Sequence, residues 1–361
     1  MSEIQTTGST DSKYEATNDC GDPSMRMWGM HRRMLGYMLG HEQFTVPQLV
    51  KNGSAASQAG FDLLATSDHL QPWQDDEGHS GLAWVTLAAL GQHANETWMG
   101  TTVTCPTIRY NPAVVAEAFA SLSLLYPGKI FAGFGSGEAL NEQAATGEWP
   151  DWETRWERLI EATAIIRKLW TGADVYHDGK HYQVNAKLYD APQQPIPIFL
   201  AANGPKAMRL AGQYGDGLIT DGATWKKHKD KFIEGLTAAG KTLEKTPILL
   251  ETYVVVGEKT EAEEAAQIWR FGPKAFTGYH NIQSPVEIRQ KAEAEIPLEE
   301  VYADWIVSID PQVHIKEIND LFDSGATIVN IHSGQMDQQR VIDFYGKRVI
   351  PAIKNVVTGA D

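Results

Sequence analysis

Eight short apolar segments alternate with helix-length amphipathic segments along most of this chain, and this alternation is the strongest constraint on its fold. The apolar segments are residues 34–39, 61–68, 98–105, 129–137, 196–204, 216–222, 247–257 and 326–334. They are almost continuously hydrophobic, as expected for strands of a parallel sheet with both faces buried. Eight such units predict a closed (β/α)8 TIM barrel. An open doubly wound sheet is the alternative, but no Gly-x-Gly-x-x-Gly motif follows the first strand.

Two of the predicted helices carry clear signals. Thr45 begins a helix that extends to about Ser57, with Pro47 in its first turn and Gly60 just past its end. Residues 151–170 place large apolar side chains three or four positions apart, which is typical of a helix with one buried face. Such helices form the outer layer of a TIM barrel.

The chain is expected to form one domain preceded by a leader. Residues 1–24 are polar and lack periodicity, so we predict a mobile leader. Residues 25–361 are predicted to form a single TIM-barrel catalytic domain. Residues 174–185 indicate a hairpin insertion, and residues 272–325, which fit the alternation less well, indicate an insertion between strands seven and eight.

The charge and the cysteines limit the partners of the chain. With 46 acidic and 31 basic residues, the formal net charge of −15 disfavours nucleic acid and anionic membranes. The sequence contains no run of about 18 apolar residues, so no membrane span is predicted. Cys20 and Cys105 show no zinc spacing and no disulfide framework, which favours a reducing cytoplasm. Arg32 and Arg33 suggest a twin-arginine export route, but the apolar part is short and lacks a small-residue cleavage site.

Polar residues stand at the carboxyl ends of four predicted strands, where TIM barrels place their working groups. These ends are residues 67–69, 136–138, 203–205 and 220–222. His69 is a candidate general base because an imidazole exchanges protons near neutral pH. Glu138 is a candidate for a second proton transfer. Either residue alone could be structural, but their joint placement on two strand ends favours catalysis.

Three further features are ambiguous from the residues alone. The helix predicted after strand five could bind an anion at its N-terminus with help from Lys206, or it could follow an ordinary turn. Trp73 and Trp84 could form a wall for a planar ligand, although tryptophans are commonly core residues. His177 and His181 have no evident carboxylate partner, so we expect no metal site.

Several motifs together resemble those of the coenzyme F420-dependent dehydrogenases in the bacterial luciferase-like superfamily. They are GHEQFT, ATSDHLQPWQ, TTVTCPTIRYNPAVVAEAFASLSLLYPGKIF, GSGEALNE, GEWP, AANGPKAMRLAGQYGDGL and WIVSIDP. The similarity extends from about residue 34 onward and is greatest to the hydroxymycolic acid dehydrogenase subgroup, with glucose-6-phosphate and secondary-alcohol dehydrogenases nearby. The resemblance implies coenzyme F420, a deazaflavin, as cofactor, an alcohol or ketone as substrate, and a homodimer.

The resemblance also implies roles for individual residues. His69 takes the position of the catalytic base, Glu138 that of the carboxylate that protonates the cofactor ring, and Trp73 that of the tryptophan that orients the substrate. A non-proline cis peptide is implied between Thr102 and Val103. The implied cofactor-binding residues are Asp68, Thr102, Val103, Cys105, Ser136, Gly137, Asn141, Asn203, Gly204, Lys206 and Ala207.

Departures from the family pattern concern the substrate. In the sugar-phosphate enzymes two lysines and an arginine hold the substrate phosphate, and the matching positions here are Ala223, Tyr279 and Asp304. Charge-assisted contacts to phosphate are strong, so their loss disfavours a phosphorylated sugar. Together with Glu42 and Thr220, these residues are the expected substrate pocket. Such a pocket fits a non-phosphorylated secondary alcohol or a hydroxylated lipid.

We therefore expect an oxidoreductase that transfers a hydride between an alcohol and coenzyme F420. The alternatives are an F420-dependent sugar-phosphate dehydrogenase, a luciferase-like monooxygenase that uses FMN, and a deazaflavin carrier without catalytic activity. A metallohydrolase that uses Asp68 and His69 is less favoured, because no second ligand cluster is evident in the sequence.

Overall fold

The computed structural model describes Met30 and residues 33–94 and 96–358. The predicted leader, residues 1–24, lies outside the described residues, and so does Arg32. Within the described ranges, every helix is too short or too polar to cross a membrane.

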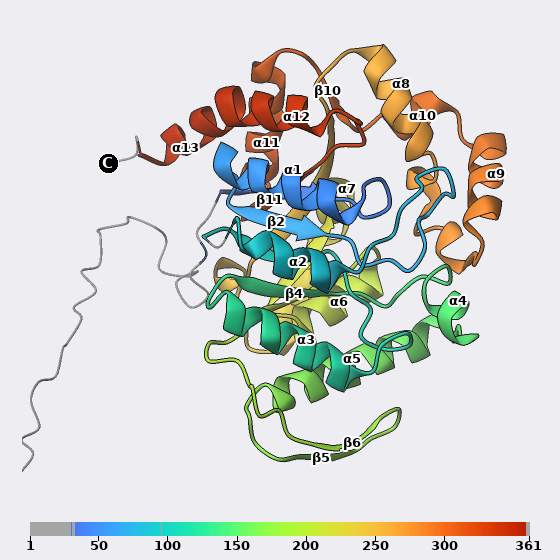
Figure 1. Ribbon diagram of the computed structural model, residues 1–361, viewed down its shortest axis with the longest axis vertical. Helices are drawn as coiled ribbons and strands as arrows, with labels where there is room; N and C mark the ends of the chain where they lie inside the picture. The colour runs from blue at the N-terminus through green and yellow to red at the C-terminus, as the bar shows by residue number, and fades with distance from the viewer. Residues whose placement is uncertain (1–29, 31–32, 95, 359–361) are drawn as a thin grey trace, which may run out of the picture.

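Eight parallel strands close into a barrel at the centre of the molecule, which confirms the predicted TIM barrel (Figure 1). Their order is β9, β11, β1, β2, β3, β4, β7 and β8, and β8 pairs with β9 to close the circle. Their bounds are β1 Met34–Leu39, β2 Leu63–Thr66, β3 Trp98–Thr101, β4 Ile130–Phe134, β7 Ile198–Ala201, β8 Gly217–Asp221, β9 Ile248–Val255 and β11 Ile328–His332.

Helices surround the strands as the outer layer (Figure 1). The regular ones are α1 Val46–Ala59, α2 Ala83–Gly91, α3 Pro112–Leu125, α5 Trp152–Leu169, α6 Pro205–Tyr214, α7 Gly222–Ala238, α11 Pro311–Asp323, α12 Gln338–Phe344 and α13 Ile350–Thr358, with the short η2 Leu243–Lys245 and η5 Tyr345–Val349. Helix α1 has the predicted signals. The Thr45 N–H donates to Gln48 Oε1 at 3.0 Å, and Gly60 ends the helix with φ of 99°, a conformation that favours glycine.

Alternate residues of each strand point into the barrel, and this alternation positions the site. On β2, Leu63 and Ala65 belong to the inner core, whereas Leu64 packs outward against the helices. Because side chains alternate along a strand, Ser67 and His69 continue the inward row beyond the end of β2. The rest of the inner core is Met30, Met34, Met38, Trp98, Phe131, Phe199, Ile219, Leu249 and Ile328.

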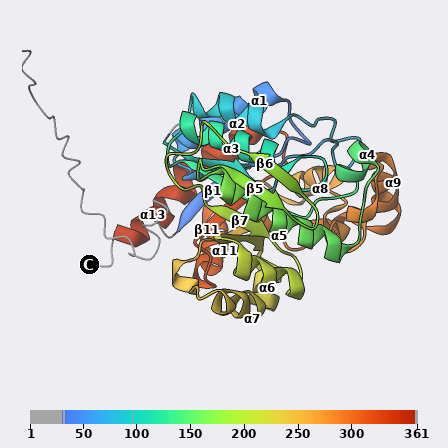
Figure 2. The same cartoon turned by 90° about the horizontal axis from the view of Figure 1, so that it is seen from below.

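Insertions interrupt the regular alternation of strands and helices in two places. β5 (Val175–Asp178) and β6 (Gln183–Ala186) form an antiparallel hairpin at the expected place. Between β9 and α11 the chain forms α8 Lys259–Ile268, η3 Gly272–Lys274, η4 Tyr279–Asn281, α9 Pro285–Glu295, α10 Leu298–Val301 and β10 Ile306–Val307. Helix α9 and the short α4 (Glu142–Thr146) lie at the same end of the molecule in both views (Figures 1 and 2). The insertion between β9 and α11 borders the mouth of the barrel, because Phe271, Phe276 and Trp305 line its cavity.

Candidate active site

A cavity of about 1370 Å³ opens where the barrel strands end. Its wall contains ten of the residues singled out from the sequence: Glu42, His69, Trp73, Thr102, Val103, Glu138, Asn203, Thr220, Ala223 and Asp304. The others do not line it: Asp68, Cys105, Ser136, Gly137, Asn141, Gly204, Lys206, Ala207 and Tyr279. The strand ends therefore converge as expected.

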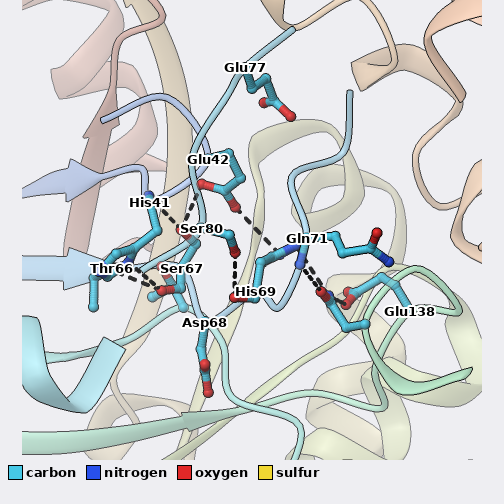
Figure 3. A network of polar contacts seen from close by, with 12 residues as sticks. His41, Glu42, Thr66, Ser67, Asp68, His69, Gln71, Glu77, Ser80 and Glu138 are labelled. Carbon is cyan, nitrogen blue, oxygen red and sulfur yellow. Dashed lines mark hydrogen bonds and ion pairs between the residues drawn. The ribbon is translucent and has the colours of Figure 1, made fainter. Parts of the chain in front are cut away.

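His69 lies in this wall with a partner at each ring nitrogen. Nε2 is 3.5 Å from Glu42 Oε1, and Nδ1 is 3.1 Å from the side-chain amide nitrogen of Asn141. The side chain of His69 is only 10% exposed. Figure 3 shows His69 between Glu42 and Glu138, which come from different strand ends. Proton-handling groups are therefore gathered around one imidazole.

The orientation of Asn141 determines which nitrogen of His69 carries the ring proton. Asn141 Oδ1 accepts from the backbone N–H of Leu70 at 2.8 Å and of Gln71 at 3.3 Å. The amide nitrogen therefore faces His69 Nδ1, and it also lies 3.2 Å from Glu138 Oε2. We assign Nδ1 as an acceptor and place the proton of neutral His69 on Nε2. Asn141, which does not line the cavity, thus contacts both predicted catalytic residues, His69 and Glu138.

Glu42 completes the arrangement from the segment after β1. Its Oε2 accepts from Ser67 Oγ at 2.7 Å, and its side chain is 3% exposed. The adjacent His41 contacts the Ser67 carbonyl and the Thr86 hydroxyl, and burial lowers the pKa of His41. Since Glu42 faces the Nε2–H of His69, these two side chains form one acid–base pair.

Glu77 is a buried carboxyl group that sequence reasoning missed. Its Oε2 accepts from the backbone N–H of Gln74 at 2.8 Å, and its Oε1 has no hydrogen-bond partner among the described residues. Burial first, and then the charge of Glu42, raise the pKa of Glu77 well above its ordinary value. Figure 3 shows Glu77 beyond Glu42, on the side away from Ser67. A protonated Glu77 leaves Glu42 without a second negative charge beside it.

Asp68 does not line the cavity, and its carboxylate points away from Glu42 (Figure 3). Its Oδ2 accepts from Thr104 Oγ1 at 2.7 Å, and its Oδ1 accepts from Arg109 and from Tyr110, each at 3.1 Å. The family resemblance implied a cofactor-binding role for Asp68, next to His69, but consecutive residues of an extended chain face opposite sides. The Asp68 side chain therefore anchors the outer layer and is not free for a cofactor in the cavity.

Another buried carboxyl group lies behind Glu138. Burial raises the pKa of Glu142 from 4.5 to about 7, although Arg109 acts in the opposite direction. Glu142 Oε2 accepts from the backbone N–H of Arg109 at 2.6 Å. Burial, and then Glu142, also raise the pKa of Cys105, whose Sγ lies 3.1 Å from Thr107 Oγ1. Cys105 is therefore a protonated thiol behind the wall.

A bulge at the end of β3 forms part of the cavity wall. The cis peptide expected between Thr102 and Val103 is present, and both residues line the cavity. Gly135 makes room for the bulge, since a Cβ there would lie 2.6 Å from Val103 Cγ2. Gly137 has φ of 80°, and a Cβ there would lie 2.8 Å from the sulfur of Cys105. Gly137 thus allows close packing behind the wall.

Helix α6 begins beside the cavity, after Asn203. The space around its N-cap is open, because no atom lies within 4 Å of the position that a Cβ on Gly204 would take. Lys206 was predicted to help bind an anion at this helix end. Its Nζ instead lies 3.4 Å from Glu153 Oε1, and its side chain is 76% exposed. Ala207 is buried in the first turn. The helix end can accept an anion, whereas Lys206 is paired at the surface.

Aromatic side chains form the wall on the side of the insertion. Trp73 stacks on Phe271 with ring centroids 4.8 Å apart and meets Phe276 edge-on at 5.9 Å. Tyr253, Trp269 and Trp305 also line the cavity. This wall suits an apolar substrate.

Tyr279 is not part of the cavity wall, so its predicted place in the substrate pocket is not the observed one. It is buried in the insertion, and its hydroxyl lies 3.1 Å from Glu295 Oε2. Tyr279 belongs to the short η4, where the regular strand–helix alternation gives no guide to side-chain direction. Ala223 and Asp304 do line the cavity, as expected.

A second imidazole–carboxylate pair in the cavity was also missed. His332, the last residue of β11, has its Nδ1 3.0 Å from Glu251 Oε1 on β9. Both residues line the cavity. The signal was present in the sequence, because Glu251 follows the inward Leu249 by two positions and His332 follows the inward Ile328 by four.

Metal binding has no support in the part of the chain that the structure describes, where no group of three or more potential ligands gathers. His177 and His181 do have carboxylate partners, in contrast to the expectation. They contact Glu161 at 3.0 Å and Glu157 at 3.2 Å, respectively. These contacts attach the hairpin to α5.

Comparisons with known proteins agree with this fold. The chain is 44% identical over 325 residues to the F420-dependent hydroxymycolic acid dehydrogenase of Mycobacterium tuberculosis, with 89% of each chain covered. It is 38% identical over 332 residues to the F420-dependent glucose-6-phosphate dehydrogenase of Kribbella flavida, covering 89% of this chain and 98% of that protein.

A solved F420-dependent secondary alcohol dehydrogenase, in complex with an F420-acetone adduct, has the same fold. The TM-score is 0.84 at 30% identity, and the match covers 89% of this chain and 99% of that one. The profile described as Luciferase-like monooxygenase matches residues 27–327. The chain therefore belongs to the luciferase-like monooxygenase family, as its motifs predicted.

Proposed function

We propose that this protein is an F420-dependent alcohol dehydrogenase, which transfers a hydride between coenzyme F420 and an alcohol or ketone. The observation that carries the proposal is the placement of His69 and Glu138 in one cavity wall, bridged by the Asn141 amide. The two relatives and the solved structure described above are named as F420-dependent dehydrogenases, which supports the same cofactor for this chain.

The residues of the cavity fit a flat deazaflavin ring with an anionic tail. Met38, Val103, Ala201 and Ile219 give the cavity an apolar surface against which a ring can lie. The open N-terminus of α6 offers backbone N–H groups to a phosphate. The bound cofactor supplies the hydride chemistry, and the protein orients the reactants and handles the protons.

In this proposal the Glu42–His69 pair accepts the hydroxyl proton of the alcohol. The carboxylate is the accepting member, because the neutral imidazole already carries its proton on Nε2. Glu138 serves the second proton exchange from its position beside Asn141. Trp73, whose ring centroid is 5.9 Å from that of His69, orients the substrate against the pair. Ketone reduction uses the same groups in reverse.

The proposed substrate is a non-phosphorylated secondary alcohol, with a hydroxylated lipid as one form. The aromatic wall provides apolar contact, and Ala223 and Asp304 give no cationic group where the sugar-phosphate enzymes hold their phosphate. Lys226 and Lys229 line the outer part of the cavity, but Glu317 and Asp320 line it as well. The cavity therefore has no concentrated positive charge for a phosphate ester.

An F420-dependent sugar-phosphate dehydrogenase is the second candidate. The 38% identity to glucose-6-phosphate dehydrogenases favours it. The uncharged Ala223 and the acidic Asp304 oppose it, because a phosphate ester is held by charge-assisted donors. Comparing glucose-6-phosphate with secondary alcohols as reductants separates the two candidates.

A homodimer in the cytoplasm is also part of the proposal. The homodimer is implied by the family resemblance, and a cytoplasmic location is favoured by the paucity of cysteines. Light scattering of the purified chain tests the first, and cell fractionation tests the second.

The proposed function is tested by a spectrophotometric screen. Purified protein is titrated with coenzyme F420 and with FMN, and cofactor reduction is followed with short and long secondary alcohols and with glucose-6-phosphate. The proposal expects F420 to bind and to be reduced by an alcohol. Tight binding without reduction would indicate a carrier, and preference for FMN would indicate a monooxygenase.

A further inference from the structure

Ser67 lies in the cavity wall, and its hydroxyl group joins the ends of two neighbouring strands. Ser67 follows β2, whereas its partners His41 and Glu42 follow β1. The hydroxyl group of Ser67 donates to Glu42 Oε2 at 2.7 Å, and its oxygen accepts from the backbone N–H of His41 at 3.0 Å (Figure 3). Ser67 is only 3% exposed, so these two contacts are shielded from solvent.

The imidazole of His41 also holds the main chain of Ser67. Its Nδ1 lies 2.8 Å from the Ser67 carbonyl oxygen, and its Nε2 lies 2.7 Å from Thr86 Oγ1. Because a carbonyl oxygen can only accept, Nδ1 carries the ring proton and Nε2 accepts from the Thr86 hydroxyl group. Burial lowers the pKa of His41, which favours this neutral ring. His41 therefore fixes both the side chain and the carbonyl group of Ser67.

These contacts determine the direction in which the Ser67 hydroxyl group donates. A hydroxyl group has one proton, and the backbone N–H of His41 can only donate, so that proton does not face His41 N. It points instead to Oε2 of Glu42, whose side chain is 3% exposed. A hydrogen bond that is donated to a carboxylate stabilises its charged form. Ser67 therefore supports Glu42 as a carboxylate and limits its rotation.

The same contact makes the two oxygens of Glu42 unequal. Oε2 accepts from the Ser67 hydroxyl group, whereas Oε1 lies 3.5 Å from Nε2 of His69. This second distance is longer than an ordinary N–H···O hydrogen bond, which measures about 2.7–3.2 Å. Oε1 therefore keeps the capacity to accept a proton from a hydroxyl group in the cavity.

We propose that Ser67 is a positioning residue that directs the hydroxyl proton of the substrate to Oε1 of Glu42. This role rests on the proposed alcohol dehydrogenase function. In alcohol oxidation the O–H bond of the substrate breaks and an Oε1–H bond forms, while the carbinol hydrogen leaves separately with two electrons as hydride to the cofactor. Ser67 keeps its own proton throughout, so it acts on the reaction only through Glu42.

The variant Ser67→Ala removes the hydroxyl group without adding bulk. The kcat for alcohol oxidation is expected to fall by about tenfold, because the carboxylate of Glu42 is no longer held in one orientation. The KM for the alcohol and the affinity for coenzyme F420 are expected to stay the same. Ser67→Thr keeps a hydroxyl group and is expected to restore most of kcat.

The matched control is Ser57→Ala. It removes a seryl hydroxyl group that lies 2.6 Å from Thr97 Oγ1, and Ser57 does not line the cavity. This control is expected to keep full activity.

A double-mutant cycle with Glu42→Gln separates positioning from a general structural role. Glu42→Gln removes the carboxylate that accepts the proton. Adding Ser67→Ala to it is expected to lower kcat no further, because the effects of residues that act as one unit do not add. A further fall in the double variant, as large as the fall that Ser67→Ala causes alone, would show that Ser67 acts by another route and would overturn the proposal.

The pH profile of kcat is a readout that a loss of packing alone would not move. In Ser67→Ala the charged form of Glu42 loses a hydrogen-bond donor, so the acid limb of the profile is expected to move to higher pH by about one unit. The other titratable groups around Glu42 are the same in both proteins, so the difference isolates Ser67. These groups are His41, His69, Glu77 and Tyr253, with Glu251 and His332 in the same cavity wall.

Carbon-13 NMR of protein labelled at the glutamate carboxyl carbons tests the contact before any cofactor is added. The Glu42 signal, identified by its absence in Glu42→Gln, is expected to titrate at higher pH in Ser67→Ala than in the unchanged protein. Identical titration overturns the proposal, and so does unchanged kcat in Ser67→Ala when the unchanged protein turns over. If the NMR shift is present but the unchanged protein reduces no cofactor with any alcohol, the proposed function fails. The catalytic role of Ser67 then fails with it, although its contact with Glu42 stands.

Discussion

The side-chain amide of Asn141 donates to Nδ1 of His69 across 3.1 Å. This contact fixes the tautomer of the imidazole, because Asn141 Oδ1 is already committed to two backbone N–H groups. The same amide nitrogen faces Glu138, so one residue outside the cavity wall orients both groups assigned to proton exchange. In the proposed mechanism, the Glu42–His69 pair accepts a proton.

Changing Asn141 to Asp tests this orientation. The new side chain keeps an oxygen for the backbone N–H groups of Leu70 and Gln71 but replaces the donor towards His69 with an acceptor. We expect kcat to fall by roughly 10- to 100-fold, while thermal stability changes little. Nitrogen-15 NMR of the histidine-labelled variant should report a proton on His69 Nδ1. Unchanged kcat with an unchanged tautomer would show that Asn141 does not orient His69.

Removing the imidazole tests the acid–base pair itself. His69→Ala should retain coenzyme F420 binding, because the apolar surface near Val103 and the end of α6 remain. Turnover should fall at least about a hundredfold, the range typical of lost general-base assistance. The exposed His93, changed to Ala, is the control. Steady-state kinetics with full turnover in His69→Ala would remove His69 from the mechanism.

Adding positive charge to the substrate pocket tests the proposed specificity. The double variant Ala223→Lys and Asp304→Lys introduces two cations where the sugar-phosphate enzymes have theirs. We expect kcat/KM for glucose-6-phosphate to rise at least about tenfold at low salt, with a smaller gain at high salt because screening weakens charge contacts. Activity with a neutral secondary alcohol should change less. If the unchanged protein already prefers glucose-6-phosphate, the assignment of a non-phosphorylated substrate is wrong.

The raised pKa of Glu142 predicts a pH-dependent stability. Folding raises this pKa from 4.5 to about 7, so the contribution of Glu142 to stability is complete below pH 4.5 and is lost as the pH rises through 7. Glu142→Gln removes that loss. The free energy of unfolding of the variant, relative to the unchanged protein, should therefore increase by about 3 kcal/mol between pH 4.5 and pH 8. Urea unfolding at several pH values measures this, and a difference that does not vary with pH would contradict it.

The barrel could be predicted because its information is local. Strands such as residues 34–39 are continuously apolar. Thr45 and Gly60 mark the ends of α1 by chemistry that needs no tertiary contact. The alternation of strands and helices did not predict side-chain directions in the insertion between β9 and α11. The direction of Tyr279 depends on how η4 packs there, and nothing in its neighbouring residues encodes that packing.

The site was predictable where one residue at a strand end carries the chemistry. His69 and Glu138 were predicted in this way, and both line the cavity. The direction of the Asp68 side chain was not predicted, because it depends on which alternate residues of the strand face the cavity. Glu77 was missed because its burial comes from the fold and not from its acidic neighbours. Glu251 and His332 follow the inward alternation of β9 and β11, so applying that alternation to every strand would have found them.

The most direct measurement is the absorbance of coenzyme F420 when purified protein and a secondary alcohol are mixed, compared with the same mixture containing His69→Ala. The account predicts that the oxidised cofactor is consumed in step with ketone formation, and that the variant binds the cofactor but consumes it at least about a hundred times more slowly. A protein that binds coenzyme F420 and leaves it oxidised with every alcohol and with glucose-6-phosphate would contradict the account.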